Sequence, residues 1–382
     1  MHFKKELGQL STTARYSIFS ALLTLCVFCA ILLYFTKRDS ADGRLLIWLS
    51  SAQMIADKPI LGHGQNSFHA KYMFYQADYN KNNPDNKYAY LADNVRMPFN
   101  EYIHLLIQYG FVGFISFAAI FILLIYYCIK GGCVNPEKKT SLFSLFSIMI
   151  IACFSYPMYY TTTILLITVN IYILAQNNKI SRGCSFKVSS SVIWVTKIGL
   201  VLALFLLIRS LKMDYKLNNI WDKLKGANDE KILAEYCFLN KTQLNKSPLF
   251  LYNYGAELNR NKRWRESVDI LLCCSKRFVD TDLAIILVDN YYNLSDYNSA
   301  EIWADIAANM SPNRFIPLYF KVMILDQTNR RNDALVLARK VIDKPMKVNN
   351  PDSYKVIFKL KKFIAERESE QVDTSLSDNR VI

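Results

Sequence analysis

The chain has 382 residues, of which 52% are hydrophobic, and its mean hydropathy of +0.09 is higher than that of a typical soluble protein. Its formal net charge is +14, but residues 1–212 carry 20 Lys/Arg and 9 Asp/Glu whereas residues 213–382 carry 26 and 23. A basic excess between apolar segments is typical of membrane topology, and no nucleic-acid-binding motif accompanies it, so we expect a membrane protein that does not bind nucleic acid. The cysteines, most of them in or beside apolar segments, indicate neither a disulfide framework nor a metal site.

Five apolar segments are candidate transmembrane helices, since each approaches the roughly 20 apolar residues that a bilayer core requires. They are Ser17–Phe35, Phe111–Ile129, Leu142–Tyr156, Thr161–Ala175 and Val192–Ile208. The third and fourth are short and adjacent, so we expect them to form a helical hairpin. The first is followed by Lys37 and Arg38 without a small-residue cleavage site, which favours a retained span over a cleaved signal peptide.

The short loops set the expected orientation. The loops 130–141 and 176–191 each carry three Lys/Arg, whereas the tip between the third and fourth spans carries no charge. The positive-inside rule therefore places both loops and the N-terminus in the cytoplasm. Segment 37–108 and residues 210–382 are then expected on the opposite side of the membrane.

The outer loop 37–108 is where we look for chemistry. Arg44 precedes an amphipathic helix near the bilayer surface, where a guanidinium can bind a phosphate with two hydrogen bonds or extend toward lipid headgroups. Gly62, His63 and Gly64 follow a proline and indicate a turn.

The end of this loop carries two further candidates. Glu101 and His104 are three residues apart, so they are expected to share one face of a helix. On the residues alone they fit a catalytic pair, or a pair of satisfied polar groups at the entry to the membrane.

After Arg209 the pattern changes to amphipathic helices with a repeat. The small residues Ser267, Ala300 and Ala334 are 33 and 34 residues apart, close to the 34-residue period of tetratricopeptide units. We therefore expect two domains: a membrane domain over 1–212 and a tetratricopeptide-like α-solenoid over 213–382, with an irregular helical bundle as the alternative. The fold class is all-α. Such arrays bind peptides or helices in a concave groove, so we expect a protein partner there.

Four spaced elements then suggest a family. They are Gly43-Arg44-x-x-Ile47-Trp48, Lys58-Pro59-x-x-Gly62-x-Gly64, Asn100-Glu101-Tyr102 and Tyr109-Gly110-x-x-Gly113. With them the chain resembles the O-antigen ligase and O-antigen polymerase family over roughly residues 35–175. More narrowly, it looks like the Bacteroidota branch, whose members often append tetratricopeptide repeats.

The resemblance implies metal- and cofactor-independent glycosyl transfer at the periplasmic face of the bacterial inner membrane, in lipopolysaccharide or polysaccharide biosynthesis. The donor would be an undecaprenyl-pyrophosphate-linked glycan, and the acceptor would be lipid A-core for a ligase or a second glycan for a polymerase. Arg44 matches the arginine that holds the pyrophosphate, and Gly62, His63, Gly64 and Asn100 fall in its loop motifs. Glu101 and His104 become candidates for the general base.

The sequence departs from the family pattern in two ways. The family places a histidine just ahead of the Asn-Glu element, where this chain has Met97 and Phe99. Family members also carry more spans ahead of the Gly-Arg element, so we expect this chain to be N-terminally short. The alternative is therefore a catalytically inactive or partial homologue that acts as a membrane-anchored repeat scaffold for a glycan-assembly complex.

Overall fold

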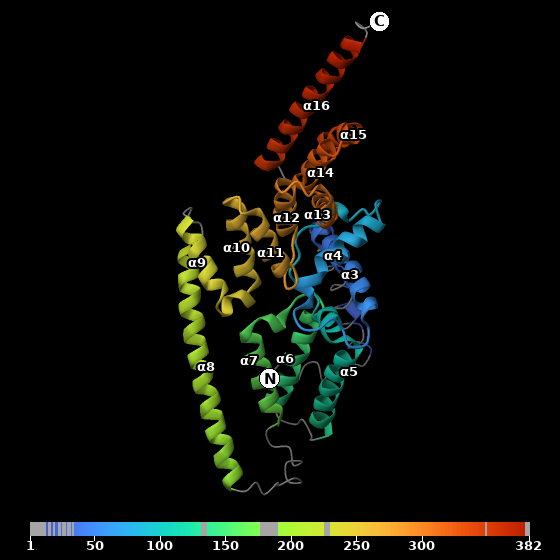
Figure 1. Ribbon diagram of the computed structural model, residues 1–382. Coiled ribbons are helices and arrows are strands. Elements are labelled where there is room, and N and C mark those ends of the chain that lie inside the picture. The colour runs from blue at the N-terminus through green and yellow to red at the C-terminus, as the bar shows by residue number, and fades with distance from the viewer. Residues whose placement is uncertain are drawn as a thin grey trace.

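A computed structural model describes residues 34–130, 136–175, 190–224, 230–347 and 350–378, with isolated positions of a helix between 13 and 32. In this part of the chain every regular element is a helix, which confirms the all-α prediction. The elements are α3 (Arg38–Asp57), α4 (Ser67–Asn82), η1 (Ala89–Leu91), α5 (Glu101–Lys130), α6 (Pro136–Ala152), η2 (Pro157–Tyr159), α7 (Thr161–Ala175), α8 (Ser190–Leu224), α9 (Glu230–Asn240), η4 (Gln243–Lys246), α10 (Pro248–Arg260), α11 (Trp264–Ser275), α12 (Thr281–Asn293), α13 (Tyr297–Met310), α14 (Ile316–Gln327), α15 (Arg331–Ile342) and α16 (Pro351–Asp378). Figure 1 shows their arrangement.

One helix of the described residues is long and apolar enough to cross a membrane. It is the stretch Glu101–Leu123 of α5, whose most apolar window has a mean hydropathy of 2.1 and is only 11% buried. A core helix of a soluble protein would bury most of that surface, so this exposure is consistent with contact to lipid. The helix begins at Glu101, ten residues before the predicted start at Phe111. The residues before Phe111 are already helical, and the backbone bends at Gly110 (φ 62°, ψ −164°) before the helix continues.

The other predicted spans correspond less closely to helices. α6 and α7 pack against each other as the expected hairpin, joined through η2, but α6 runs over Pro136–Ala152 rather than 142–156. The apolar part of α7, Thr161–Leu174, is shorter than a bilayer span. The segment 192–208 lies within α8, and most of its side chains, like most of the segment 17–35, lie outside the described residues. The number of spans remains a prediction.

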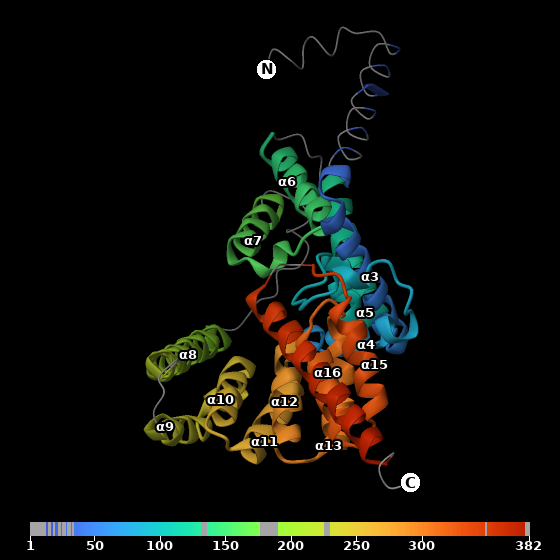
Figure 2. The same cartoon turned by 90° about the horizontal axis from the view of Figure 1, so that it is seen from above.

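After α9, helical hairpins follow one another in the order α10–α11, α12–α13 and α14–α15, and Figures 1 and 2 show the first two side by side. The small residues of the predicted repeat lie where the helices cross. Ser267 is fully buried and its hydroxyl donates to the carbonyl of Gly255 at 2.7 Å, while Ala300 and Ala334 are also fully buried. The predicted domain boundary at residue 212 falls inside α8, which continues without interruption to Leu224.

The outer segment 37–108 is not a free loop. It forms α3 and α4, and α4 packs against α13. A single hydrophobic core includes Tyr72 and Met73 of α4 together with Leu287 of α12 and Met310 of α13. The outer segment and the helical hairpins therefore bury apolar surface against each other, which stabilises the contact between them.

Candidate functional site

The turn that contains the two glycines is locked onto the bend of α5. The amide of Phe111 donates to the carbonyl of Pro59 at 2.8 Å, and the amide of Gly64 donates to the carbonyl of Gln108 at 3.0 Å. These bonds satisfy backbone groups that the bend removes from the helical ladder. Because the Gly64 amide already has this partner, it is not available to cradle a phosphate.

Gly62 in the turn and Gly110 at the bend of α5 must be glycines, because the two backbones approach too closely there to leave room for a Cβ. A Cβ on Gly62 (φ +69°) would lie 2.5 Å from the carbonyl carbon of Gln108, and one on Gly110 (φ +62°) would lie 2.3 Å from the carbonyl oxygen of Ile60. The positive φ angles also disfavour any residue with a Cβ. The motif glycines thus fix the angle at which the outer segment meets α5.

Asn100 caps the same helix. Its Oδ1 accepts from the amides of Tyr102 and Ile103 at 2.9 and 3.0 Å, and its Nδ2 donates to the carbonyl of Cys153 at 3.0 Å. The side chain satisfies free amides at the start of α5 and ties that start to the end of α6. Asn100 is thereby committed to positioning the helix.

Glu101 and His104 do share one face of α5. The carboxylate Oε1 lies 3.8 Å from Nδ1 of His104, whose Nε2 is 2.7 Å from the side-chain amide of Gln108. The second carboxylate oxygen of Glu101 is buried, with no hydrogen-bond partner among the described residues. Neither residue lines the large cavity described below.

His63 has both ring nitrogens engaged. Its Nε2 lies 2.8 Å from the carbonyl of Met54, so this nitrogen carries the hydrogen, and Nδ1 accepts from the ammonium of Lys71 at 3.3 Å. Burial, and to a smaller extent the charges of Lys71 and Lys58, lower the pKa of His63. A neutral His63 of fixed tautomer orients Lys71 and has no free lone pair to accept a proton from a substrate.

A cavity of about 900 Å³ opens beside Lys71. Its walls come from the start of α4, the segment around Arg96, the aromatic tip between α6 and α7, and two segments at the edge of the helical hairpins. Five side chains carry positive charge, namely Lys71, Arg96, Lys246, Lys276 and Arg277, and no described lining residue is acidic. A cavity with one sign of charge concentrates anions, so it is suited to a negatively charged ligand.

His69, which the sequence analysis did not single out, also lines this cavity. Burial is the main cause that lowers its pKa, with smaller contributions from the nearby charges of His104 and Arg96. Its ring makes no hydrogen bond to any described residue, so the lone pair of a neutral ring nitrogen is not engaged by the protein and can accept a proton. A signal was present in the sequence, because three of the four histidines fall between residues 63 and 104.

Arg44 lies in a separate, smaller cavity of about 190 Å³. Its guanidinium is 5.5 Å from the ring centroid of Phe99, and the Phe99 ring is 5.6 Å from that of Tyr156, which lines the large cavity. Phe99 therefore stands between the two cavities. Arg44 is half-buried and has no hydrogen bond or ion pair with a described residue, so its charge is free to bind an anion.

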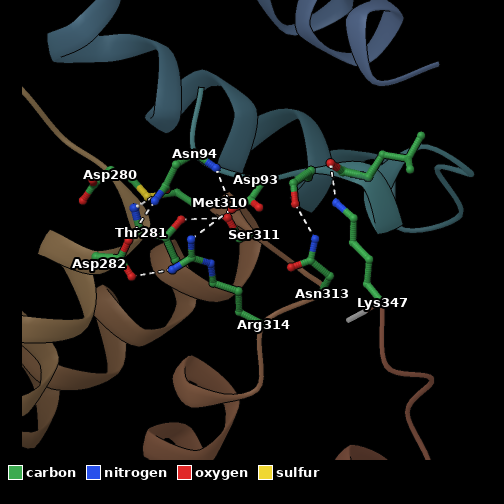
Figure 3. Close-up of polar contacts among 12 residues, drawn as sticks. Asp93, Asn94, Asp280, Thr281, Asp282, Met310, Ser311, Asn313, Arg314 and Lys347 are labelled. Atoms are coloured by element: carbon green, nitrogen blue, oxygen red, sulfur yellow. Dashed lines mark hydrogen bonds and ion pairs between the residues drawn. The ribbon is translucent and has the colours of Figure 1, made fainter. Parts of the chain in front are cut away.

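A polar network holds the segment that carries Arg96 against the hairpins (Figure 3). Asn94 Nδ2 donates to Asp282 at 2.8 Å, and Asn94 Oδ1 accepts from the amide of Thr281 at 2.9 Å. Arg314 reaches Asp93 at 3.0 Å and also pairs with Asp282. The hairpins thus fix the position of the Arg96 segment, and the cavity depends on both parts of the chain.

In comparison with known proteins, one family model matches part of the chain. A family model described as O-antigen ligase matches residues 3–118, a range that includes Arg44, the glycine turn and the Glu101–His104 pair. This supports the resemblance over that range, while the narrower branch and the tetratricopeptide assignment remain predictions. No curated protein and no solved structure matches the chain.

Proposed function

We propose that the protein is an O-antigen ligase-type glycosyltransferase of the bacterial inner membrane, which uses a polyprenyl-pyrophosphate-linked glycan as donor. Loop 37–108 and residues 210–382 then lie in the periplasm. The observation that carries the proposal is the basic cavity, which is lined in part by residues of the range that resembles O-antigen ligases.

The reaction that fits this cavity is a displacement at the anomeric carbon of the donor sugar. The acceptor hydroxyl forms the new C–O bond, the bond from that carbon to the pyrophosphate oxygen breaks, and the pyrophosphate leaves with the electron pair. Lys71 and Arg96 stabilise the charge that develops on the leaving group, an electrostatic effect that is often the largest catalytic contribution. His69 takes the proton of the acceptor hydroxyl as general base.

Arg44, Glu101 and His104, which the resemblance suggested, lie outside the large cavity. Arg44 remains a candidate for binding the pyrophosphate from the adjoining smaller cavity. Glu101 and His104 do not line the large cavity, and the charge of His104 lowers the pKa of His69. We therefore propose His69 ahead of Glu101 and His104 as the base.

A second candidate function, a non-catalytic scaffold for glycan assembly, is favoured by Met97 and Phe99, which occupy the two positions where the family can carry its histidine. A complementation experiment separates the two. A strain that lacks the gene would receive the wild-type protein, a Lys71→Ala/Arg96→Ala double variant, or Lys81→Ala, which removes an exposed lysine of α4 outside the cavity.

Surface glycan would be compared by gel electrophoresis, with equal membrane levels of each variant verified by immunoblot. We expect the double variant to lose the attached or polymerised glycan and Lys81→Ala to retain it. A full glycan profile in the double variant would overturn the catalytic proposal and favour the scaffold.

A further inference from the structure

The wall of the cavity that belongs to the helical hairpins lies outside residues 3–118, the range that matches the family model. It presents Lys246 from the end of η4, with Lys276 and Arg277 directly after α11. Arg277 Nη1 donates to the carbonyl of Asn245 at 3.0 Å, which draws the two segments together. Three exposed cations are thereby held on one side of a shared space.

The charge of these three residues exceeds what the leaving group needs. A pyrophosphate that links two groups carries about one negative charge on each phosphate, and Lys71 and Arg96 of the outer segment, which line the same cavity, already supply two positive charges. The three further cations face the same space, where no described lining residue is acidic. Like charges held close together repel, so additional negative charge on the ligand would be favourable there.

An aromatic surface borders the same space. Tyr156 and Tyr159, at the tip between α6 and α7, both line the cavity, and 67% of Tyr159 is exposed. Tyr156 stacks on Tyr160 with ring centroids 6.0 Å apart and an interplanar angle of 21°, which holds its ring in place. A rigid aromatic ring offers an apolar face to the C–H face of a sugar.

We infer that the wall formed by Lys246, Lys276 and Arg277, together with the two tyrosines that line the same cavity, is a subsite for an acidic sugar of the lipid-linked glycan. The tyrosines contact the ring, and the lysines and arginine bind its carboxylate or phosphate substituent. The inference rests on the proposed function and adds the class of glycan: one that carries negative charge beyond its pyrophosphate.

The test uses the full chain in nanodiscs of zwitterionic lipid and measures binding by isothermal titration calorimetry. The probes are a galacturonate hexamer, a neutral glucose hexamer of the same length, and geranylgeranyl pyrophosphate. The variant is Lys276→Gln/Arg277→Gln at the end of α11. Its matched control is Lys262→Gln/Arg265→Gln, which removes two exposed cations near the opposite end of the same helix.

We expect the wild-type protein to bind the galacturonate hexamer at least about tenfold more tightly than the neutral hexamer. The Lys276/Arg277 variant would lose that preference but keep its affinity for geranylgeranyl pyrophosphate, and the control variant would match the wild type. Equal binding of the two hexamers, or an unchanged preference in the variant, would overturn the inference. Loss of the preference in nanodiscs that contain phosphatidylglycerol would also overturn it, by showing a lipid headgroup in the subsite.

The binding of geranylgeranyl pyrophosphate distinguishes a failure of the proposed function from a failure of the acidic-sugar subsite. If geranylgeranyl pyrophosphate does not bind, or binds without dependence on Lys71 and Arg96, the proposed donor is wrong. If it binds as expected and the two hexamers bind equally, the donor stands and only the acidic-sugar subsite is wrong. Thermal unfolding of each variant, followed by circular dichroism, would show that the substitutions leave the fold intact.

Discussion

Asn94 of the outer segment and Asp282 of α12 are 188 residues apart in the chain and are joined by a 2.8 Å hydrogen bond. The other end of the Asn94 amide accepts from the backbone of Thr281 at 2.9 Å. One side chain therefore connects the part of the protein that resembles O-antigen ligases with the helical hairpins. The bond adds to the packing of α4 against α13 and to the pair of Arg314 with Asp93, which join the same two parts of the chain.

Replacing Asn94 by Ala should loosen that connection. The change removes both hydrogen bonds and leaves the Thr281 amide without its partner, which typically costs about 1–3 kcal/mol. We expect faster hydrogen–deuterium exchange in residues 88–97 and in the first turn of α12. Asn83→Ala is the control, because the side chain of Asn83 donates to the carbonyl of Tyr79 in α4, the helix that it directly follows; equal exchange in the two variants would contradict the proposed connection.

The assignment of His69 as base can be separated from the resemblance-based candidates by comparing single variants. His69→Gln should lower the rate of transfer by about 10²–10⁴-fold, as expected for loss of a general base, with little change in donor affinity. His104→Gln, which removes a residue outside the cavity, should have a much smaller effect. Single-turnover assays with a lipid-linked donor would measure both. A larger loss in His104→Gln would identify His104 as the base instead.

The rate of transfer should depend on pH through His69. Burial lowers the pKa of His69 below its usual value of 6.5, so the base stays neutral at pH 7 and the rate should fall only as the pH drops below about 6.5. Stability follows the same direction: the unfolded chain binds the proton more readily than the folded one, so this contribution is complete above pH 6.5 and is lost as the pH falls through the folded pKa.

Rate profiles between pH 4.5 and 8 would test this, with His69→Gln as the control that should remove the acidic limb from the residual rate. An acidic limb that persists unchanged in the variant would show that another group titrates.

Arg44 allows a clean test of charge, since it has no ion pair with a described residue to disturb. Arg44→Ala should weaken binding of geranylgeranyl pyrophosphate, whereas Arg44→Lys, which keeps the charge but not the paired donors, should retain part of it. The control is Arg38→Ala, whose side chain lies 3.5 Å from Asp42 on the same helix. Affinity equal to wild type in Arg44→Ala would remove Arg44 from the donor site.

The sequence predicted those features that depend on local pattern. Ser267, Ala300 and Ala334 could be assigned to helix crossings because a helical hairpin requires small side chains at regular spacing. The docking of the outer segment was not predictable, because Asn94 and Asp282 belong to no periodic pattern and meet only in the folded chain. For the same reason the sequence motifs suggested one site for Arg44 and the turn around His63. In the structure His63 lines the large cavity, whereas Arg44 lies in the smaller one, beside Phe99.

The contact between the Pro59–Gly64 turn and the bend of α5 at Gly110 offers the most direct test of the architecture. Gly110→Ala would place a Cβ about 2.3 Å from the carbonyl oxygen of Ile60 at a φ of +62°, so either the Pro59–Gly64 turn or the bend in α5 must shift. Backbone strain of this kind typically costs about 1–3 kcal/mol, and the clash adds to it. We expect a lower midpoint of thermal unfolding for Gly110→Ala in detergent.

Gly43→Ala is the matched control, because Gly43 lies inside α3 with nothing within 4 Å of a new Cβ, and alanine is favoured over glycine in a helix by about 1 kcal/mol. The two substitutions are chemically identical, so opposite shifts in the midpoint would isolate the effect of the contact at Gly110, and a stabilised Gly110→Ala protein would show that the bend does not require glycine.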